Sequence, residues 1–261
     1  NFPTTKHPIF GIFVKEQIDS LIKENVQSKV FFINGKEKGK IEYVKSIFRL
    51  SKLLKENSFD VVHCHHVFSA IVFLLTFKYK NNKSIVSFQN DPDKESILNL
   101  FNLVKNKVTC WIFKNNSIYV KHKKGIYLPN GVNTFFFKPI DRIIAKNKLG
   151  LDINKKYILF VSSNYIRNQK RYDVFKATIK ELKKNDDTIE ELKMINVNRE
   201  LTPYYFNAAN LHLLTSDFEG SPNSVKESMS CNTPVVSRDV GNVRELFEGV
   251  DSCRIGSESP K

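Results

Sequence analysis

The sequence predicts an α/β protein with two units, each built on a parallel sheet. Strand-like and helix-like segments alternate along both halves of the 261 residues, and such alternation is typical of parallel sheets with helical crossovers. The clearest pattern lies near the C-terminus, where strand-like runs at 211–214 and 234–237 flank a glycine turn and a helical segment at 223–231. The run at 157–161 starts a second pattern, which continues into a helical segment at 171–184.

The charge balance divides the chain in two. Residues 1–138 carry 22 Lys+Arg against 10 Asp+Glu, whereas residues 139–261 carry 19 against 17. The aromatic run at 135–137 is followed by Lys138 and a proline, as expected for a crossing between domains. We therefore predict an N-terminal domain over residues 1–138 and a C-terminal domain over residues 139–261.

The basic excess of the N-terminal half predicts an anionic partner, such as lipid headgroups, a phosphorylated acceptor or nucleic acid. Neither an RNP-type aromatic pattern nor zinc-finger spacing accompanies the charge, which makes nucleic acid an unlikely partner. A solvated lysine-rich surface is the alternative interpretation.

The composition is that of a globular protein, with 41% hydrophobic and 26% charged residues. The chain opens Asn1–Lys6 without a visible secretory signal, and its longest apolar run, Val67–Phe77, is too short to cross a bilayer. Four cysteines lie apart without CxxC pairing, which predicts reduced thiols. We therefore expect a cytoplasmic protein, peripheral on the inner face of the plasma membrane if the basic half meets anionic lipid.

The segments expected in the N-terminal half follow from periodicity and from turn residues. A helix follows Gly11, and this glycine either lets a ligand approach the backbone or simply makes a turn. The further expected segments are a strand at 29–33, a helix at 44–54, a strand at 59–66, a buried helix at 67–79, a strand at 84–88, a helix at 98–104, and strands at 117–120 and 126–128.

The strand at 59–66 ends in a histidine cluster. Alternation along a strand places His63 and His65 on one face and Cys64 and His66 on the other, which argues against one metal site that uses all four. Histidines at the carboxyl end of a strand in an α/β fold lie where ligands bind, so His65 and His66 are site candidates. The Asp-Pro-Asp at 91–93 is read as a turn and helix cap rather than as a metal site.

Two glutamates, Glu219 and Glu227, bracket the Gly-Ser-Pro turn of the C-terminal pattern. Amides at the start of the helix after this turn would point at an anion. Glu227 lies about one and a half turns into that helix and can face the same ligand. An acidic loop followed by a solvated helix face is the alternative.

Two cations, Arg167 and Lys170, come just before the helical segment at 171–184. Positive charge at a helix N-terminus is unfavourable unless an anion lies there, so the pair predicts a phosphate site. Exposed basic loop residues are the alternative.

Several separated motifs resemble the retaining glycosyltransferases of the GT-B fold, family 4. The motifs that carry the resemblance are the loop Gly11–Val14, the DxxHxH strand end Asp60–His66, the LPNGVD-like turn Leu128–Asn133, the lysine loop Arg167–Tyr172, the segment Asn207–Asn210, the E-x7-E motif Glu219–Glu227 and the tail Pro234–Gly241.

The resemblance implies two Rossmann-like domains with parallel sheets facing a central cleft, the C-terminal one holding a nucleotide-diphosphate sugar. It implies that Lys170, helped by Arg167, neutralises the donor diphosphate, that Glu219 contacts the transferred sugar, and that Glu227 contacts the ribose hydroxyls. No metal or cofactor besides the donor is expected, because lysine, arginine and a helix dipole can do that work. The predicted catalytic residues are Glu219, His65 and Gln89, and the predicted donor-binding residues are Arg167, Lys170, Gly220, Ser221, Pro222, Asn223, Ser224, Val225, Glu227, Gly11, Asn130 and Gly131.

The chain departs from the family pattern at two site positions. Ser162-Ser163 stand where the family usually has Gly-Arg. Gln89 stands where the family often has a histidine, and a glutamine can hydrogen-bond a sugar hydroxyl but cannot act as an acid or base at neutral pH.

The chain also looks incomplete against the family. No strand precedes Phe2, no long helix follows Gly256, and the stretch at 121–125 joins two predicted strands without the expected helix. We therefore expect a fragment that lacks the first strand and the last helix of the fold.

The predicted function is retaining transfer of a hexose from a nucleotide-diphosphate sugar to a saccharide or lipid-linked acceptor, in cell-surface polysaccharide biosynthesis. The alternatives are a non-catalytic module that binds a nucleotide sugar or polyanion, and an epimerase or phosphorylase of the same fold.

Overall fold

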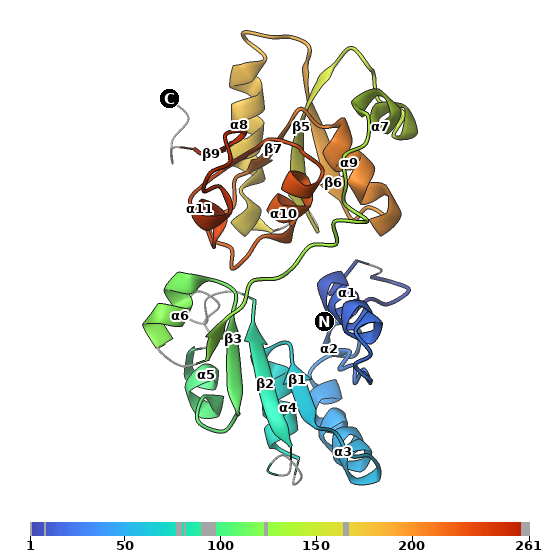
Figure 1. Ribbon diagram of the computed structural model, residues 1–261, viewed down its shortest axis with the longest axis vertical. Helices are drawn as coiled ribbons and strands as arrows, with labels where there is room; N and C mark the ends of the chain where they lie inside the picture. Colours follow the sequence, from blue (N-terminus) through green and yellow to red (C-terminus); the bar gives the residue numbers. More distant parts are fainter. Residues whose placement is uncertain are drawn as a thin grey trace. The chain divides into compact units, whose positions relative to one another are not determined.

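The computed structural model describes residues 2–7, 9–76, 80, 82–89, 98–122, 125–163 and 167–256. The chain divides into two units, Asn1–Pro129 and Asn130–Lys261. Each unit has its own parallel sheet with helices around it (Figure 1). The α/β class expected from the alternating segments is therefore confirmed in both halves.

The first unit is built on a parallel sheet with the strand order β1-β2-β3-β4. Its elements are α1 (Ile12–Lys23), α2 (Gly35–Lys38), α3 (Ile41–Glu56), β1 (Val61–Cys64), α4 (Val67–Leu74), β2 (Lys83–Phe88), α5 (Leu98–Val104), β3 (Cys110–Phe113), α6 (Asn116–His122) and β4 (Ile126–Tyr127). The predicted Asp-Pro-Asp cap at 91–93 lies outside the described residues.

The strand expected at 29–33 is absent from the structure, and this prediction was wrong. The segment is irregular, although Phe31 and Ile33 pack against the core of the first unit. A strand needs a ladder partner for its backbone groups, and among the described residues none pairs with this segment. The apolar residues at 29–33 therefore reflect burial rather than sheet formation.

The strand expected at 117–120 was also wrong, because these residues belong to helix α6. Asn115 starts this helix: its Oδ1 accepts hydrogen bonds from the Ser117 amide at 2.8 Å and the Ser117 hydroxyl at 2.7 Å. The strand lies earlier, at β3, which the sequence analysis did not predict. The expected gap at 121–125 is thus no missing helix, since α6 is the crossover from β3 to β4.

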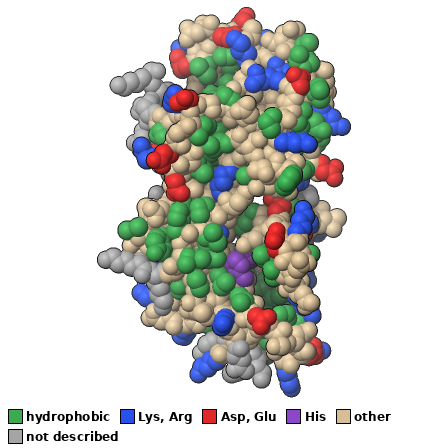
Figure 2. Space-filling model, viewed as in Figure 1, with side chains coloured by type: hydrophobic (Ala, Val, Ile, Leu, Met, Phe, Trp, Pro, Cys, Tyr) green, Lys and Arg blue, Asp and Glu red, His purple; other side chains and the backbone are tan. Residues whose placement is uncertain are grey.

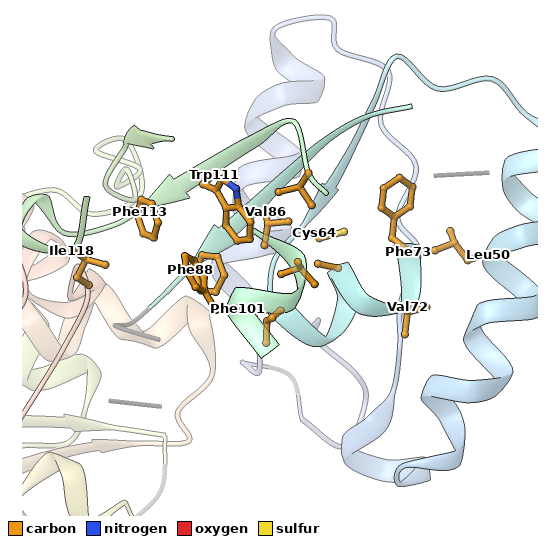
Figure 3. Packing of buried hydrophobic residues seen from close by; sticks show 14 of the residues in the cluster. Leu50, Cys64, Val72, Phe73, Val86, Phe88, Phe101, Trp111, Phe113 and Ile118 are labelled. Atoms are coloured by element: carbon orange, nitrogen blue, oxygen red, sulfur yellow. The ribbon is translucent and has the colours of Figure 1, made fainter. Parts of the chain in front are cut away.

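One face of the first sheet carries the core of this unit. Val86, Phe88, Trp111 and Phe113 are 3% exposed or less, and they alternate along β2 and β3 as a face of period two requires. Figure 3 shows how these side chains gather with Phe101 of α5 and with residues of α4. Phe88 stacks on Trp111 at 5.2 Å between ring centroids. The hydrophobic core of the first unit therefore lies on this face of the sheet.

The second unit is built on a parallel sheet with the order β6-β5-β7-β8-β9. Its elements are α7 (Arg142–Lys148), β5 (Lys156–Ser162), the 3-10 helix η2 (Asn168–Lys170), α8 (Tyr172–Leu182), β6 (Ile189–Ile195), η3 (Arg199–Leu201), α9 (Thr202–Ala208), β7 (Leu211–Leu214), α10 (Asn223–Ser230), β8 (Val235–Ser237), α11 (Val243–Leu246) and β9 (Cys253–Ile255).

Both faces of the second sheet are covered. Leu159 lies in a core shared with α7 and α9, whereas Ile158 and Phe160, on the other face of β5, pack on α8. Helix α8 contributes Phe175 and Ile179, which are one turn apart and therefore share one side of the helix. Burial on both faces explains the nearly continuous apolar run of β5.

The strand order of the second sheet reverses beside β5. The chain leaves β5 and returns to it on one side as β6 and on the other side as β7. In open α/β sheets, ligands bind at such a switch point, outside the carboxyl ends of the strands. The loops after Ser162 and Leu214 therefore frame the predicted binding position of this unit.

The segment 130–138 belongs to the second unit, so the predicted domain boundary after Lys138 lies inside that unit. Phe137 is 1% exposed and packs edge-on against Phe206 of α9 at 5.8 Å. The carbonyl of Phe137 also accepts a hydrogen bond from the Ser230 hydroxyl. The division of charge in the sequence thus falls later than the division of packing.

Candidate functional site

Lys170 and Glu219 meet at the switch point of the second sheet. The Lys170 Nζ lies 2.6 Å from Oε1 of Glu219, and each side chain is only 13% exposed. Lys170 ends η2 after strand β5, and Glu219 lies in the loop after β7. Two residues far apart in the sequence, both predicted as site residues, are therefore brought together.

Hydrogen bonds to backbone carbonyls hold the two loops against each other. The Thr215 hydroxyl donates to the carbonyl of Lys170 at 2.7 Å, and the Asp217 amide donates to the carbonyl of Gln169 at 2.9 Å. The Gln169 side-chain amide donates to the Phe218 carbonyl. These contacts fix the position of the Lys170 ammonium relative to Glu219.

Arg171 directly follows Lys170 and has a left-handed backbone conformation, with φ 49° and ψ 54°. This conformation is uncommon for a residue with a Cβ. Its guanidinium contacts Asp173 at 2.9 Å and Asp217 at 3.1 Å, and these hydrogen bonds raise the pKa of Arg171 further above its ordinary value. The charge of Arg171 is thus paired with Asp173 and Asp217, whereas the ammonium of Lys170 contacts Glu219.

Helix α10 begins beside Glu219 without a side-chain cap. No acceptor in the described part of the chain takes the first-turn amides of Asn223 and Ser224, so these N–H groups are open to an anion. Pro222 has no amide hydrogen and serves as the residue before the helix, and the Val225 amide donates to the Pro222 carbonyl at 3.2 Å. Of the predicted donor-binding residues on this turn, Pro222 and Val225 therefore offer no amide hydrogen to a ligand.

Glu227 is buried and paired. Its Oε1 accepts a hydrogen bond from Nη2 of Arg199 at 2.7 Å, and Glu227 is 7% exposed. The Arg199 guanidinium in turn lies over the ring of Phe137 at 4.6 Å. The solvated helix face that was the alternative reading of Glu227 is excluded. Arg199 was missed by the sequence analysis, because a lone arginine between β6 and α9 carries no motif.

Lys226 is a second residue that the sequence analysis missed. It is 8% exposed, and its Nζ donates to the carbonyl of Asn130 at 2.7 Å and to the Ser221 hydroxyl at 2.6 Å. Lys226 therefore ties together two predicted donor-binding residues. A lysine in a helix normally reads as solvated, so only its position inside the E-x7-E motif could have drawn attention to it.

The other predicted residues of the second unit lie nearer the surface. Arg167 is exposed, and its Nη2 donates to Oε1 of Gln169 at 3.0 Å. Gly131 is exposed, and a Cβ added there would meet no atom within 4 Å. Gly220 is buried, and its carbonyl oxygen lies 2.6 Å from the position of a Cβ added to Gly241. This approach locks the turn that carries Glu219.

The first unit holds the predicted residues Gly11, His65 and Gln89. Gly11 precedes α1 with φ 74°, a left-handed conformation that favours glycine. His65 directly follows β1, and Gln89 directly follows β2, so both lie at the carboxyl edge of this sheet. This edge is where parallel sheets bind ligands.

The remaining histidines of the cluster have other contacts. Nδ1 of His66 accepts a hydrogen bond from the Phe68 amide at 3.2 Å and caps α4. His63 lies 2.7 Å from the Ser87 hydroxyl through its Nε2. Within the described ranges, no three His, Cys, Asp or Glu side chains are placed to hold a metal ion. His66 thus has a structural contact that its prediction as a site residue did not foresee.

Burial lowers the basicity of the histidines at this edge. The pKa of His63 falls to about 4, first because of burial and then because of the nearby Lys114 charge. The pKa of His65 falls to about 3 because of burial, of His63 and of Lys114. Both rings are therefore neutral at physiological pH.

Two family models match the sequence. The model for glycosyl transferases group 1 matches residues 193–261, and the model for glycosyl transferase 4-like proteins matches residues 12–89. The chain is 28% identical over 241 residues to the capsular polysaccharide biosynthesis glycosyltransferase CapH of Staphylococcus aureus. This match covers 77% of the chain and 64% of the relative, so the chain spans less than two thirds of that protein.

Solved structures share the fold. Sucrose-phosphate synthase from Thermosynechococcus elongatus superposes with a TM-score of 0.68 at 15% identity, over 89% of this chain and 68% of that one. HepE of Anabaena, in complex with UDP-glucose, superposes with a TM-score of 0.63 at 16% identity, over 92% of this chain and 76% of that one. These likenesses cover both units and show the GT-B fold.

No helix in the described ranges combines the length and the hydropathy that a bilayer span needs. The two family models lie in different units, and each unit contains the predicted motif residues at the carboxyl edge of its sheet. In sequence and in fold, the chain is thus similar to the group 1 glycosyltransferases of the GT-B fold.

Proposed function

We propose that this chain forms the catalytic part of a retaining hexosyltransferase, which transfers a sugar from a nucleotide-diphosphate sugar to a saccharide or lipid-linked acceptor. The observation that carries the proposal is the Lys170–Glu219 pair beside the open amides of α10. An ammonium and helix N-terminal amides together suit a diphosphate. A role in polysaccharide biosynthesis is supported by the resemblance to CapH.

In the proposed complex, the donor diphosphate lies between Lys170 and the amides of Asn223 and Ser224. Glu219, which accepts a hydrogen bond from Lys170 in the structure, then accepts hydrogen bonds from hydroxyls of the transferred sugar. Glu227, oriented by Arg199, accepts hydrogen bonds from the ribose. The positive charge of Lys170 and the helix dipole stabilise the leaving diphosphate, so the proposed reaction uses no metal.

The proposed chemistry breaks the bond between the anomeric carbon and the diphosphate oxygen, and the nucleoside diphosphate leaves with the electron pair. An acceptor hydroxyl forms the new bond on the same face of the sugar, and its proton passes to the leaving phosphate oxygen. The configuration at the anomeric carbon is thereby retained. Lys170 contributes most where negative charge develops on the leaving group.

Ligands in related structures support a nucleotide-sugar donor. HepE of Anabaena has been solved with UDP-glucose, and also with UDP and glucose. TarM of Staphylococcus aureus has been solved with UDP and alpha-GlcNAc-glycerol, and it superposes with a TM-score of 0.60 at 14% identity. UDP-sugars are therefore the first donors to assay.

The first prediction concerns Lys170 and Glu219, measured as sugar transfer from UDP-, GDP- and ADP-sugars. Lys170→Met removes a charge-assisted contact, so donor affinity should fall by about 10- to 100-fold. Glu219→Gln should lower kcat more than it raises KM, because its contact is made to the reacting sugar. Lys180→Met, at an exposed position of α8, is the matched control and should leave both constants unchanged.

Full activity of both Lys170→Met and Glu219→Gln, with folding confirmed by circular dichroism, would contradict the assignment. Donor binding without any transfer would instead indicate the non-catalytic module.

Contact with an anionic membrane and a cytoplasmic location stay predictions that rest on the charge and cysteine pattern. Sedimentation with anionic vesicles at low and high salt tests the membrane contact.

A further inference from the structure

A buried lysine lies at the carboxyl edge of the first sheet. Lys114 directly follows β3 and is 4% exposed. The proposed donor contacts use residues of the second unit, so Lys114 has no part in them. Lysines are almost never fully buried without a partner.

The strand register places Lys114 on the same face as three other polar residues. Paired residues, and residues two apart on one strand, point to the same face of a sheet. His63 pairs with Ile85, and Ser87 follows Ile85 by two residues. Ser87 in turn pairs with Ile112, which lies two residues before Lys114. This face carries the polar cluster, which consists of His63, His65, Ser87 and Lys114. The opposite face is the apolar core seen in Figure 3.

The contacts inside the polar cluster leave two nitrogens unused. His63 lies 2.7 Å from the Ser87 hydroxyl, and the rings of His63 and His65 stack at 4.2 Å. Nδ1 of His65 is buried and has no hydrogen-bond partner within the described part of the chain. The Lys114 ammonium makes neither a hydrogen bond nor an ion pair with any described residue.

Phe13 of α1 packs edge-on against His65 at 6.5 Å between ring centroids. Helix α1 starts one residue earlier at Ile12, after the left-handed Gly11, and no side chain caps its first turn. A helix N-terminus without a cap adds positive potential near the polar cluster. Figure 2 shows histidine in purple at the surface of the first unit, next to hydrophobic side chains.

The charge of Lys114 has no counter-charge nearby in sequence. Between Glu95 and Asp141 the sequence contains no Asp or Glu. Burial lowers the pKa of Lys114 to about 8, and the charge of Lys114 contributes to the low pKa of His63 and His65. A buried cation of this kind is costly unless a ligand completes it.

We propose that the polar cluster binds an oxyanion, a carboxylate or phosphate group, carried by the acceptor. That the anion belongs to the acceptor rests on the proposed function, because the donor diphosphate is assigned there to the second unit. Lys114 supplies the charge, and the neutral rings of His63 and His65 supply directional hydrogen bonds. A neutral acceptor would leave the Lys114 charge unpaired, and the cluster would therefore discriminate against it.

The second prediction is that anionic ligands bind the polar cluster and that a neutral sugar does not. It is tested on the full chain without donor, by NMR of the histidine ring protons and by calorimetry. The probes are inorganic phosphate, glucuronate, glucose 6-phosphate and glucose. Phosphate or the two charged sugars should bind and shift the His63 and His65 signals, and glucose should not. The tighter of glucuronate and glucose 6-phosphate identifies the group as carboxylate or phosphate.

Lys114→Met should weaken this binding at least 10-fold, and Lys114→Arg should retain part of the affinity. Lys107→Met is the matched control, because Lys107 is exposed and precedes the same strand β3 at its other end. Raising the pH to 9.5 should weaken binding by about 30-fold, because a lysine with a pKa near 8 is then mostly uncharged. The Lys114→Met protein should fold, since the change removes a buried charge.

Anion-induced shifts of the His63 and His65 signals that survive in Lys114→Met, or equal shifts from glucose and glucuronate, would overturn the proposal, as would failure of every anion to shift these signals. These results do not depend on sugar transfer. A protein that binds the anions but transfers no sugar refutes the proposed function and leaves the polar cluster as an anion site. A protein that transfers sugar but binds no anion refutes only the polar cluster.

Discussion

Single buried residues control how this protein responds to acid. His212, in the middle of β7, is fully buried, and neither ring nitrogen has a hydrogen-bond partner among the described residues. Burial, and then the charge of Lys170, lower its pKa to about 3 from the ordinary 6.5. The folded state therefore holds this histidine neutral where the unfolded chain would protonate it.

The third prediction is that stability falls as the pH is lowered from about 6.5 towards 3. In this window the unfolded chain binds a proton at His212 that the folded chain does not bind, and each such histidine contributes a slope of up to about 1.4 kcal/mol per pH unit. His63 and His65 contribute in the same direction. His212→Phe should flatten the dependence measured by urea unfolding, and an unchanged slope would contradict the assignment.

At the scale of elements, the turn before α11 supports the loop that carries Glu219. Gly241 has φ 60°, and a Cβ added to it would lie 2.6 Å from the Gly220 carbonyl oxygen. Gly249 has a similar φ of 73° but no atom within 4 Å of an added Cβ. Both glycines thus have a left-handed backbone conformation, but only Gly241 lies so close to another backbone atom that an added Cβ would clash with it.

The fourth prediction compares Gly241→Ala with Gly249→Ala. The control, Gly249→Ala, should cost about 1–2 kcal/mol of unfolding free energy for the left-handed conformation alone. Gly241→Ala should cost more and should also weaken donor binding, because the Gly220 backbone must shift. Equal losses of stability in thermal unfolding, with equal donor affinity, would show that the approach to Gly220 carries no constraint.

At the scale of the whole molecule, the two units have separate cores. The segment 130–138 supplies Phe137 to the core of the second unit and the Asn130 carbonyl to Lys226. A fragment that starts at Pro139 loses both contacts, although the sequence analysis placed the domain boundary there.

The fifth prediction is that a fragment 130–261 unfolds cooperatively, whereas a fragment 139–261 is less stable by about 3–5 kcal/mol. This is the usual cost of removing a buried phenylalanine side chain, and the lost Lys226 contact adds to it. Chemical denaturation of both fragments measures the difference. Equal midpoints would place the packing boundary after Lys138.

The sequence predicted the second unit better than the first for a physical reason. Strands β5 and β7 are apolar runs bounded by turn residues, and the site residues around them follow from motif spacing. In the first unit, β3 (Cys-Trp-Ile-Phe) went unrecognised, and the segment at 29–33 had strand composition without a partner strand. Sheet formation depends on non-local pairing, which periodicity does not report.

The same limit applies to the candidate site. Lys170 and Glu219 were predicted from their motifs and are in contact, whereas Lys114, Arg199 and Lys226 were missed. Each of the three is a basic residue that local sequence describes as solvated, and each is drawn inward by tertiary packing. Whether a cation is buried depends on carbonyls, rings and carboxylates from distant segments, as with Lys226 and Asn130.

The contact between Lys170 and Glu219 has a consequence for any anion that approaches α10. Glu219 already occupies the ammonium at 2.6 Å, so it acts as an intramolecular competitor that is present at high effective concentration. A lone phosphate must displace this carboxylate from Lys170 and offers Glu219 no hydrogen-bond donor in return. A ligand that also offers hydroxyls to Glu219 replaces the hydrogen bond that Glu219 loses when Lys170 turns to the anion. The pair therefore acts as a filter that favours an anion joined to a sugar over the same anion alone.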